Sequence, residues 1–147
     1  MRRLKALLVL VALLAAGGAA AGELVVRDGG GSRVGVIESG GTVRDGSGRM
    51  VARIDGNGDV RDGSGSLLGR SQGGEVRDAG GSLVARYGGD GVIRDGSGRR
   101  WRVVDPDGTV RDASGRAIGR FDGGGRDPAD MAREAAWLVL VNPHTLS

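Results

Sequence analysis

The residues best suited to nucleophilic catalysis do not occur in a pattern that supports it. Gly69-Arg70-Ser71-Gln72-Gly73 matches the G-x-S-x-G pattern of serine hydrolases, which needs a strand–turn–helix context and a histidine partner for the serine. The only histidine is His144, near the end of the chain, and there is no cysteine. Residues 22–147 also contain no lysine for a Walker-type phosphate site. We therefore predict a protein that is not an enzyme and has no catalytic residues.

Aspartate-rich turns raise the question of calcium. Asp55-Gly56-Asn57-Gly58-Asp59 has the spacing of an EF-hand start, but Val60 stands where Gly is required and Ser66 where Glu is required. The calcium-binding nonapeptide pattern also fails, because Gly88-Gly89-Asp90-Gly91-Val92 is followed by Ile93. The simpler interpretation is that the aspartates hydrogen-bond to the backbone of their own turns. We predict no metal site and no cofactor, and weak calcium binding at the turns stays an open alternative.

Aromatic side chains are the remaining candidates for ligand contact. The chain has two tryptophans, one tyrosine and one phenylalanine. Trp101 and Tyr87 are placed in the repeat region and have the ring types that stack on sugars. With Trp137, they are the residues that we predict to contact a ligand or partner. A single tryptophan in one unit of a repeat is more often a core residue, so sugar binding is an alternative rather than the leading hypothesis.

The first 21 residues have the composition of a targeting segment. Three basic residues within the first five positions precede an apolar stretch at 7–16, and Ala19-Ala20-Ala21 supplies the small residues that a signal peptidase accepts. The apolar stretch is shorter than the roughly 20 residues of a spanning helix. We predict a signal peptide at 1–21, cleaved near Ala21, and a periplasmic or secreted bacterial protein. Without cysteine, lipoprotein anchoring is excluded.

Removal of that segment changes the charge balance. The whole chain has 21 basic and 18 acidic residues and a formal net charge of +3. All of the acidic residues, but only 18 of the basic ones, lie in residues 22–147, which are therefore formally neutral. Net charge thus gives no reason to expect a nucleic-acid partner, and we predict none.

A tripeptide that recurs six times indicates that most of the chain is a repeat. It reads Val-Arg-Asp, with Ile replacing Val once, and successive copies lie 17 residues apart except for one spacing of 16. We call these the VRD tripeptides: 26–28, 43–45, 60–62, 76–78, 93–95 and 110–112. Each unit has two turns rich in Gly, Asn and Asp, and between them short segments rich in Val, Ile, Arg and Thr. Each unit is therefore predicted to be one β-hairpin.

One hairpin is not stable alone, so six must stack into an open solenoid or close into a ring. Residues 23–28 and 117–122 are single strand segments at the two ends of the repeat, and we expect them to pair and close it. One strand position is apolar in all six copies, and the next is small in five, with Arg102 as the exception. A repeated small residue indicates close approach, either by neighbouring hairpins or by an inserted element.

The arginine of each VRD tripeptide follows the apolar residue and should lie on the opposite face of its strand. We expect it to face solvent or to pair with an aspartate of a neighbouring repeat. Surface pairs of this kind contribute about 0–1 kcal/mol each. The simplest interpretation is a solvated, charged face that prevents edge-to-edge aggregation.

The last segment, 126–147, has helix signals. Asp127 is suited to cap a helix and Pro128 to begin it, and Asn142-Pro143 should end it after Val141. Its second half, Ala135 to Val141, is apolar on every side and too short to span a bilayer. We expect a short C-terminal α-helix packed on or into the hairpins, with membrane-surface or partner binding as the alternative.

This order of segments, with hairpin repeats of the form VRD-x-x-G-R, resembles the bacterial β-flower proteins, a family described as five-fold. The resemblance implies a ring of radiating hairpins from residue 24 to about 141. The family has no established activity, so no functional residues can be transferred. One departure is that this chain has six VRD tripeptides. A second resemblance, to YD-type repeats through Asp45-Gly46-Ser47-Gly48-Arg49, is weaker because the tyrosine of those repeats is missing.

The sequence thus predicts an all-β fold, a ring-like or solenoid array of about six 17-residue hairpins with a short C-terminal helix. The predicted segments are 1–21, 22–125 and 126–147. The expected function is that of an exported, non-enzymatic structural or interaction module of the bacterial cell envelope, with a protein or glycan as partner. The alternatives are a carbohydrate-binding module and membrane-surface association through Ala135 to Val141.

Overall fold

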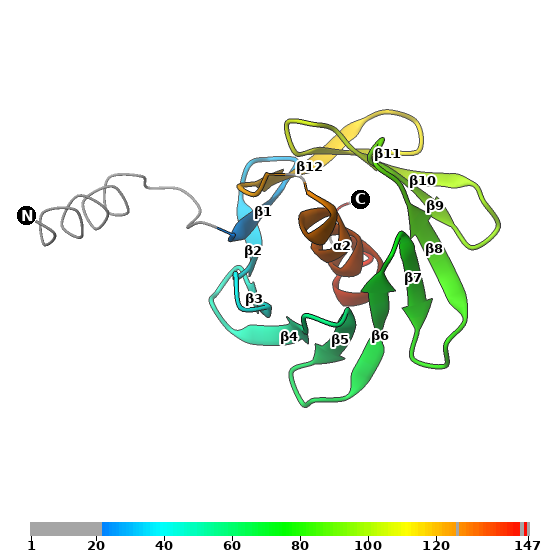
Figure 1. Cartoon of the computed structure of the whole chain (residues 1–147). Coiled ribbons are helices and arrows are strands. Elements are labelled where there is room, and N and C mark those ends of the chain that lie inside the picture. The colour runs from blue at the N-terminus through cyan, green and yellow to red at the C-terminus, as the bar shows by residue number, and fades with distance from the viewer. Residues whose placement is uncertain (1–21, 126, 145, 147) are drawn as a thin grey trace, which may run out of the picture.

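A computed structural model describes residues 22–125, 127–144 and 146 of the chain. The predicted signal peptide at 1–21 lies outside the described residues. Twelve antiparallel strands, each hydrogen-bonded to the next, form a closed ring around a C-terminal helix (Figure 1). The strands are β1 (Leu24–Asp28), β2 (Arg33–Ile37), β3 (Thr42–Asp45), β4 (Met50–Ile54), β5 (Asp59–Asp62), β6 (Leu67–Gln72), β7 (Glu75–Asp78), β8 (Leu83–Tyr87), β9 (Val92–Asp95), β10 (Arg100–Val104), β11 (Thr109–Asp112) and β12 (Ala117–Asp122).

Pairing of the first and last strands closes the ring. β1 and β12 are antiparallel, with Val26 opposite Phe121 and Arg27 opposite Arg120. Closure removes both free edges, which would otherwise offer unpaired backbone groups to other chains. The expectation of a ring rather than an open solenoid is therefore confirmed, as is the array of six hairpins, each contributing two strands.

The VRD aspartates organise the turns at the hairpin tips. In the second hairpin, Asp45 Oδ1 accepts hydrogen bonds from the backbone amides of Ser47 (2.9 Å) and Arg49 (3.0 Å) and from the Ser47 hydroxyl (2.7 Å). The Ser47 hydroxyl and the Arg49 amide hold the pKa of this carboxyl below its usual value. The same two backbone bonds are made by all six VRD aspartates: Asp28, Asp45, Asp62, Asp78, Asp95 and Asp112.

The VRD arginines hold the same turns from the outside. Arg44 Nη1 donates to the carbonyl of Gly48, four residues later, at 3.2 Å. The other five tripeptides repeat this bond: Arg27 to Gly31, Arg61 to Gly65, Arg77 to Gly81, Arg94 to Gly98 and Arg111 to Gly115. Five of the apolar residues of the tripeptides are valines with no exposed surface, and the sixth, Ile93, is 3% exposed. Each tripeptide therefore supplies one core residue and two residues that close the turn.

One shortened turn explains the irregular spacing. Gly73 and Gly74 connect β6 to β7, with Gln72 directly opposite Glu75. Both glycines have positive φ angles, 62° and 85°, as a two-residue hairpin turn of type I′ requires. The other turns between successive hairpins are longer, for example the four residues between β4 and β5. The third and fourth VRD tripeptides therefore lie 16 rather than 17 residues apart.

The C-terminal segment fills the centre of the ring. Helix α2 (Pro128–Ala136) begins after Asp127, whose side chain accepts a hydrogen bond from the Asp130 amide. A π-helical turn, η1 (Trp137–Val141), follows. The sequence predicted an α-helix as far as Val141, and this is wrong for the last turn: Asn142 N–H donates to the Trp137 carbonyl five residues earlier, which widens that turn. No helix in the described part of the chain is long and apolar enough to cross a membrane.

The repeated small residues lie where this segment is inserted. A Cβ atom added to Gly35 would stand 3.3 Å from Trp137 Nε1, and one added to Gly119 would stand 2.7 Å from Leu146 Cδ1. Contacts this short leave no room for a side chain. Backbone of the neighbouring hairpin is equally close, since the same Cβ atoms would stand 3.3 Å from the Arg44 carbonyl oxygen and 2.7 Å from the Arg27 carbonyl oxygen. Both the neighbouring hairpins and the inserted segment therefore make the close approach predicted from the sequence.

Candidate functional site

Trp137, one of three predicted contact residues, lies in the core. It is 0% exposed, and its ring meets Phe121 edge-on at 6.0 Å with an interplanar angle of 87°. Its Nε1 has no hydrogen-bond acceptor among the described residues. A ligand has no access to this indole in the structure, so Trp137 acts as a core residue here, because the closed ring surrounds the segment that carries it.

Trp101 is partly buried and covered on one face. The guanidinium group of Arg102 lies 4.3 Å from the centre of its ring, and Arg102 Nη2 donates to the Leu146 carbonyl at 3.4 Å. Burial lowers the pKa of Arg102. Arg102, the exception to the small-residue position, thus attaches the C-terminal residues to the fifth hairpin. Trp101 also lines a cavity of about 230 Å³ with Val139 and Pro143.

Tyr87 does not line the cavity beside Trp101. It borders a gap of about 10 Å³ beside α2, together with Met131 and Glu134. This gap and the cavity beside Trp101 have no lining residue in common. The structure therefore does not bring the three aromatic candidates into one site.

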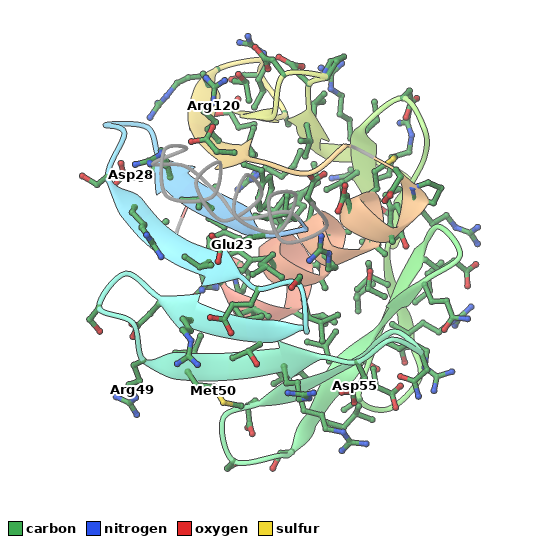
Figure 2. The ribbon with its side chains drawn as sticks, turned by 60° about the vertical axis from the view of Figure 1, so that its left-hand side comes forward. Glu23, Asp28, Arg49, Met50, Asp55 and Arg120 are labelled. Atoms are coloured by element: carbon green, nitrogen blue, oxygen red, sulfur yellow. The ribbon has the colours of Figure 1, made fainter. Side chains whose placement is uncertain are left out.

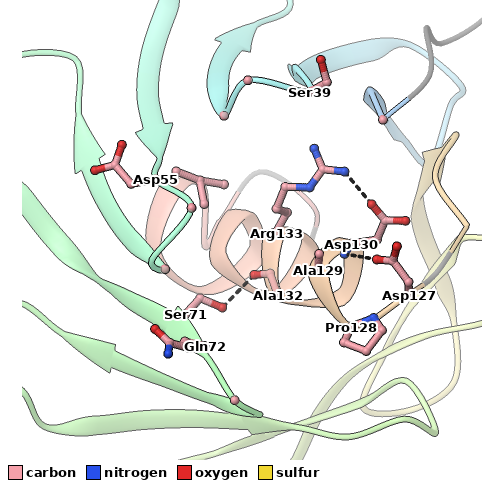
Figure 3. A pocket seen from close by; sticks show the side chains of 17 residues that line it. Ser39, Asp55, Ser71, Gln72, Asp127, Pro128, Ala129, Asp130, Ala132 and Arg133 are labelled. Carbon is pink, nitrogen blue, oxygen red and sulfur yellow. Dashed lines mark hydrogen bonds and ion pairs between the residues drawn. The ribbon is translucent and has the colours of Figure 1, made fainter.

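A larger cleft opens where α2 begins (Figure 3). It has a volume of about 600 Å³ and lies between α2 and the turns that join β2 to β3, β4 to β5 and β6 to β7. Its width comes from small residues on both sides: Ala129 and Ala132 on the helix, and Gly40, Gly56 and Gly73 on the turns. The volume is in the range of small-molecule sites. Sequence reasoning did not identify this cleft, because its two sides come from distant parts of the chain, residues 39–73 and 127–133.

Charged groups in the cleft are engaged with one another. Arg133 Nη2 lies 2.5 Å from Asp130 Oδ1, and both side chains are largely buried. The Gly125 amide donates to Asp130 Oδ2 at 2.7 Å. Asp55, on the opposite side, forms ion pairs with Arg53 (3.2 Å) and Arg61 (3.8 Å). Among the described residues, no group of three or more His, Cys, Asp or Glu side chains is placed to hold a metal ion.

Ser71, the central residue of the G-x-S-x-G match, has a structural contact. It is 2% exposed, and its hydroxyl donates to the Ala132 carbonyl at 2.7 Å. This bond attaches α2 to strand β6. The role could not be derived from the sequence, because the two residues are 61 positions apart.

The outer face carries ion pairs at the junctions between hairpins. Glu38 pairs with Arg44 at 3.1 Å, and Asp105 pairs with Arg111 at 2.7 Å. The closure between β12 and β1 has the same arrangement, with Arg27 2.8 Å from Asp122. Figure 2 shows charged side chains such as Asp28 and Arg49 on the outside of the ring, at the hairpin tips. Pairing of VRD arginines with an aspartate of a neighbouring repeat was expected from the sequence. It is confirmed for Arg27 and Arg111, and at Arg44 a glutamate takes the aspartate's place.

A closed ring of hairpins around a short helix defines the class: a flower-like β-repeat protein. The chain matches the model of the 5-fold beta-flower proteins over residues 23–136, and it belongs to this family. Its own ring has six hairpins, one for each VRD tripeptide. No curated protein and no solved structure matches the chain.

Proposed function

We propose that this protein is an exported, non-enzymatic interaction module of the bacterial cell envelope, in which the ring is a rigid scaffold. The observation that carries the proposal is the use of the VRD tripeptides. Their six aspartates and six arginines bond to their own hairpin turns, so these repeated charged groups serve the fold. The cleft beside α2 supplies a surface that is not repeated and is of the size of a ligand site.

Export is supported by the sequence of residues 1–21, with its basic start, apolar centre and small-residue end. Expression of the full chain in a bacterial host, followed by fractionation and intact-mass measurement, tests this. We expect a periplasmic or secreted product that begins at Gly22. The matched control carries Val9→Arg and Leu13→Arg, which interrupt the apolar centre, and should stay in the cytoplasm at full length. A wild-type protein that stays there too would overturn the export proposal.

The interaction is tested by crosslinking from the cleft. A photoreactive residue replaces Ser39, which lines the cleft, and in a control it replaces Ser64, which lies at a hairpin tip and outside the cleft. In intact bacteria we expect defined crosslinked products from position 39 that are absent from position 64. The same products at both positions, or none at position 39, would contradict an interaction surface in the cleft.

The two sequence-derived alternatives have less support. Association with a membrane surface needs an exposed apolar helix face. Ala135, Ala136, Trp137 and Leu138 are at most 2% exposed, which leaves only the half-buried residues 139–141 for such a contact. Sugar stacking would depend on Trp101 alone, and Arg102 covers one face of that indole. We therefore regard membrane-surface association and sugar stacking as less well supported than the interaction module.

A further inference from the structure

One junction on the outer face lacks the carboxylate that the others have. At three turns an acidic residue stands six positions before the VRD arginine: Glu38 before Arg44, Asp55 before Arg61 and Asp105 before Arg111. At the closure Asp122 serves Arg27, and at the shortened turn Glu75 serves Arg77. Before Arg94 the equivalent position is Gly88.

Arg94 differs from the other VRD arginines as a result. Among the residues that the structure describes, it has no ion pair, whereas each of the other five has at least one. It is exposed, whereas the others are half-buried. Its bond to the Gly98 carbonyl is 3.4 Å long, compared with 3.0–3.2 Å in the other five turns.

Two further arginines lie directly beside it. Arg86 on β8 is in register with Arg94 on β9, and Arg100 on β10 is opposite Arg94 next to a register shift in the β9–β10 pairing. The three therefore lie across three neighbouring strands. All three are exposed. Side chains opposite each other on neighbouring antiparallel strands have Cβ atoms about 5 Å apart. We call these three residues the arginine row.

The acidic groups near the row either accept hydrogen bonds from their own turns or contact only the arginine at one end of the row. Glu75 lies 3.4 Å from Arg86 and also pairs with Arg77. Asp90 Oδ1 accepts the Val92 amide of its own turn, and Asp95 Oδ1 accepts bonds from Ser97 and Arg99. Like charges opposite each other on paired strands repel unless a counter-charge is supplied. At the other junctions a carboxylate of the protein is this counter-charge. At the arginine row a bound external anion would take its place.

We propose that the arginine row binds a linear anionic polysaccharide, whose acidic groups contact successive guanidinium groups. Guanidinium groups bind carboxylate and phosphate in bidentate geometry. Because the row is exposed, a single small anion is held weakly by it, but a chain with regularly spaced charges engages several arginines at once. Nucleic acids use larger basic surfaces, typically with six or more phosphate contacts, and residues 22–147 are formally neutral. The inference deepens the proposed function, because it names the chemistry of one envelope partner.

Binding of a hexameric oligogalacturonate to the purified protein, made from the full chain, tests the proposal in low-salt buffer at pH 7. We expect measurable binding that weakens with salt, and Arg94→Gln should lower the affinity about five- to tenfold through loss of one charge-assisted contact. The matched control, Arg44→Gln, removes an equivalent arginine whose partner is Glu38 and should leave the affinity unchanged. Thermal unfolding of both variants checks that they remain folded.

Three comparison probes identify the source of the anion: a neutral galactan oligomer, single-stranded DNA and vesicles containing an anionic phospholipid. We expect weaker binding to each than to oligogalacturonate. No binding of oligogalacturonate, an equal loss in Arg44→Gln, or tighter binding to DNA or vesicles would overturn the proposal. These results are independent of export, which the fractionation experiment tests separately.

Discussion

The inner and outer faces of the ring use the same repeat in different ways. On the inner face, equivalent residues meet different parts of one inserted segment, so that Gly35 approaches Trp137 while Gly119 approaches Leu146. On the outer face, equivalent residues make the same bond in every hairpin, as Arg44 does with Gly48. A substitution inside therefore removes a contact that has no copy elsewhere, whereas one outside weakens one hairpin of six.

The largest effect is expected at the centre of the ring. Trp137→Ala should lower the free energy of unfolding by about 3–5 kcal/mol, because it removes a fully buried indole and leaves a cavity. Urea denaturation measures this. Trp101→Ala is the control, since this indole is only partly buried, and it should have a clearly smaller effect. Equal losses of unfolding free energy in the two variants would show that a buried residue of the inner face contributes no more to stability than a partly buried one.

Two glycines with similar backbone angles separate crowding from conformation. Gly41 and Gly48 have φ angles of 98° and 92°. A Cβ added to Gly41 would lie 2.0 Å from the Ile54 carbonyl oxygen, whereas one added to Gly48 would meet no atom within 4 Å. Gly48→Ala should therefore destabilise by about 1–2 kcal/mol, the cost of a left-handed alanine. Gly41→Ala should destabilise clearly more, as measured by urea denaturation, and equal effects would contradict the predicted clash.

Much of the fold could be predicted because its determinants are local. The VRD tripeptides and their glycines specify each turn within five residues, so the hairpins and their number follow from the sequence. Ring closure could be inferred because residues 23–28 and 117–122 are each half of a hairpin. The cleft, the Ser71–Ala132 bond and the role of Arg102 depend on residues far apart in the chain. No spacing rule relates such residues, so these features required the structure.

The stability of the ring at acid pH should depend on the aspartates at the hairpin tips. A serine hydroxyl bound to the carboxylate is the largest cause of the lowered pKa of Asp45, Asp62, Asp95 and Asp112. A lowered pKa in the folded state contributes stability that is complete above the ordinary value, 3.8, and is lost as the pH falls through the folded value. We therefore expect urea denaturation midpoints that are level from pH 7 to about 5 and fall below about pH 4.

The control for this prediction replaces the four serines at these tips, Ser47, Ser64, Ser97 and Ser114, by alanine. This variant should be less stable than wild type at pH 7 and should lose less on acidification, so that the two proteins converge as the pH falls below the ordinary carboxyl value, 3.8. Parallel pH profiles would mean that the serine hydroxyls do not stabilise the ionised carboxylates.

The smallest effect on stability is expected on the outer face. Arg44→Gln removes an ion pair whose two side chains are both about 40% exposed, and it should reduce the free energy of unfolding by less than about 1 kcal/mol. Arg94→Gln should have a smaller effect still, because no described carboxylate pairs with Arg94. Denaturation in low and high salt measures both, and a larger loss for Arg94→Gln would contradict the difference between the junctions.

That difference is clearest between two junctions of the same design. Arg53 and Arg61 lie opposite each other across β4 and β5, and Asp55 pairs with both. Arg86 and Arg94 lie opposite each other across β8 and β9, where Gly88 takes the place of the aspartate. Residues that follow the repeat hold the hairpins, and departures from it leave groups available for contacts with other molecules.

The most direct test of this claim restores the repeat at Gly88. Gly88→Asp introduces a carboxylate six residues before Arg94, as Asp105 precedes Arg111, and Gly89→Asp adds the same charge one residue further along the turn. The measurement is the affinity for hexameric oligogalacturonate. We predict that Gly88→Asp lowers it about tenfold without loss of thermal stability, and that Gly89→Asp lowers it much less. Unchanged affinity in Gly88→Asp, or equal losses in the two variants, would contradict the account.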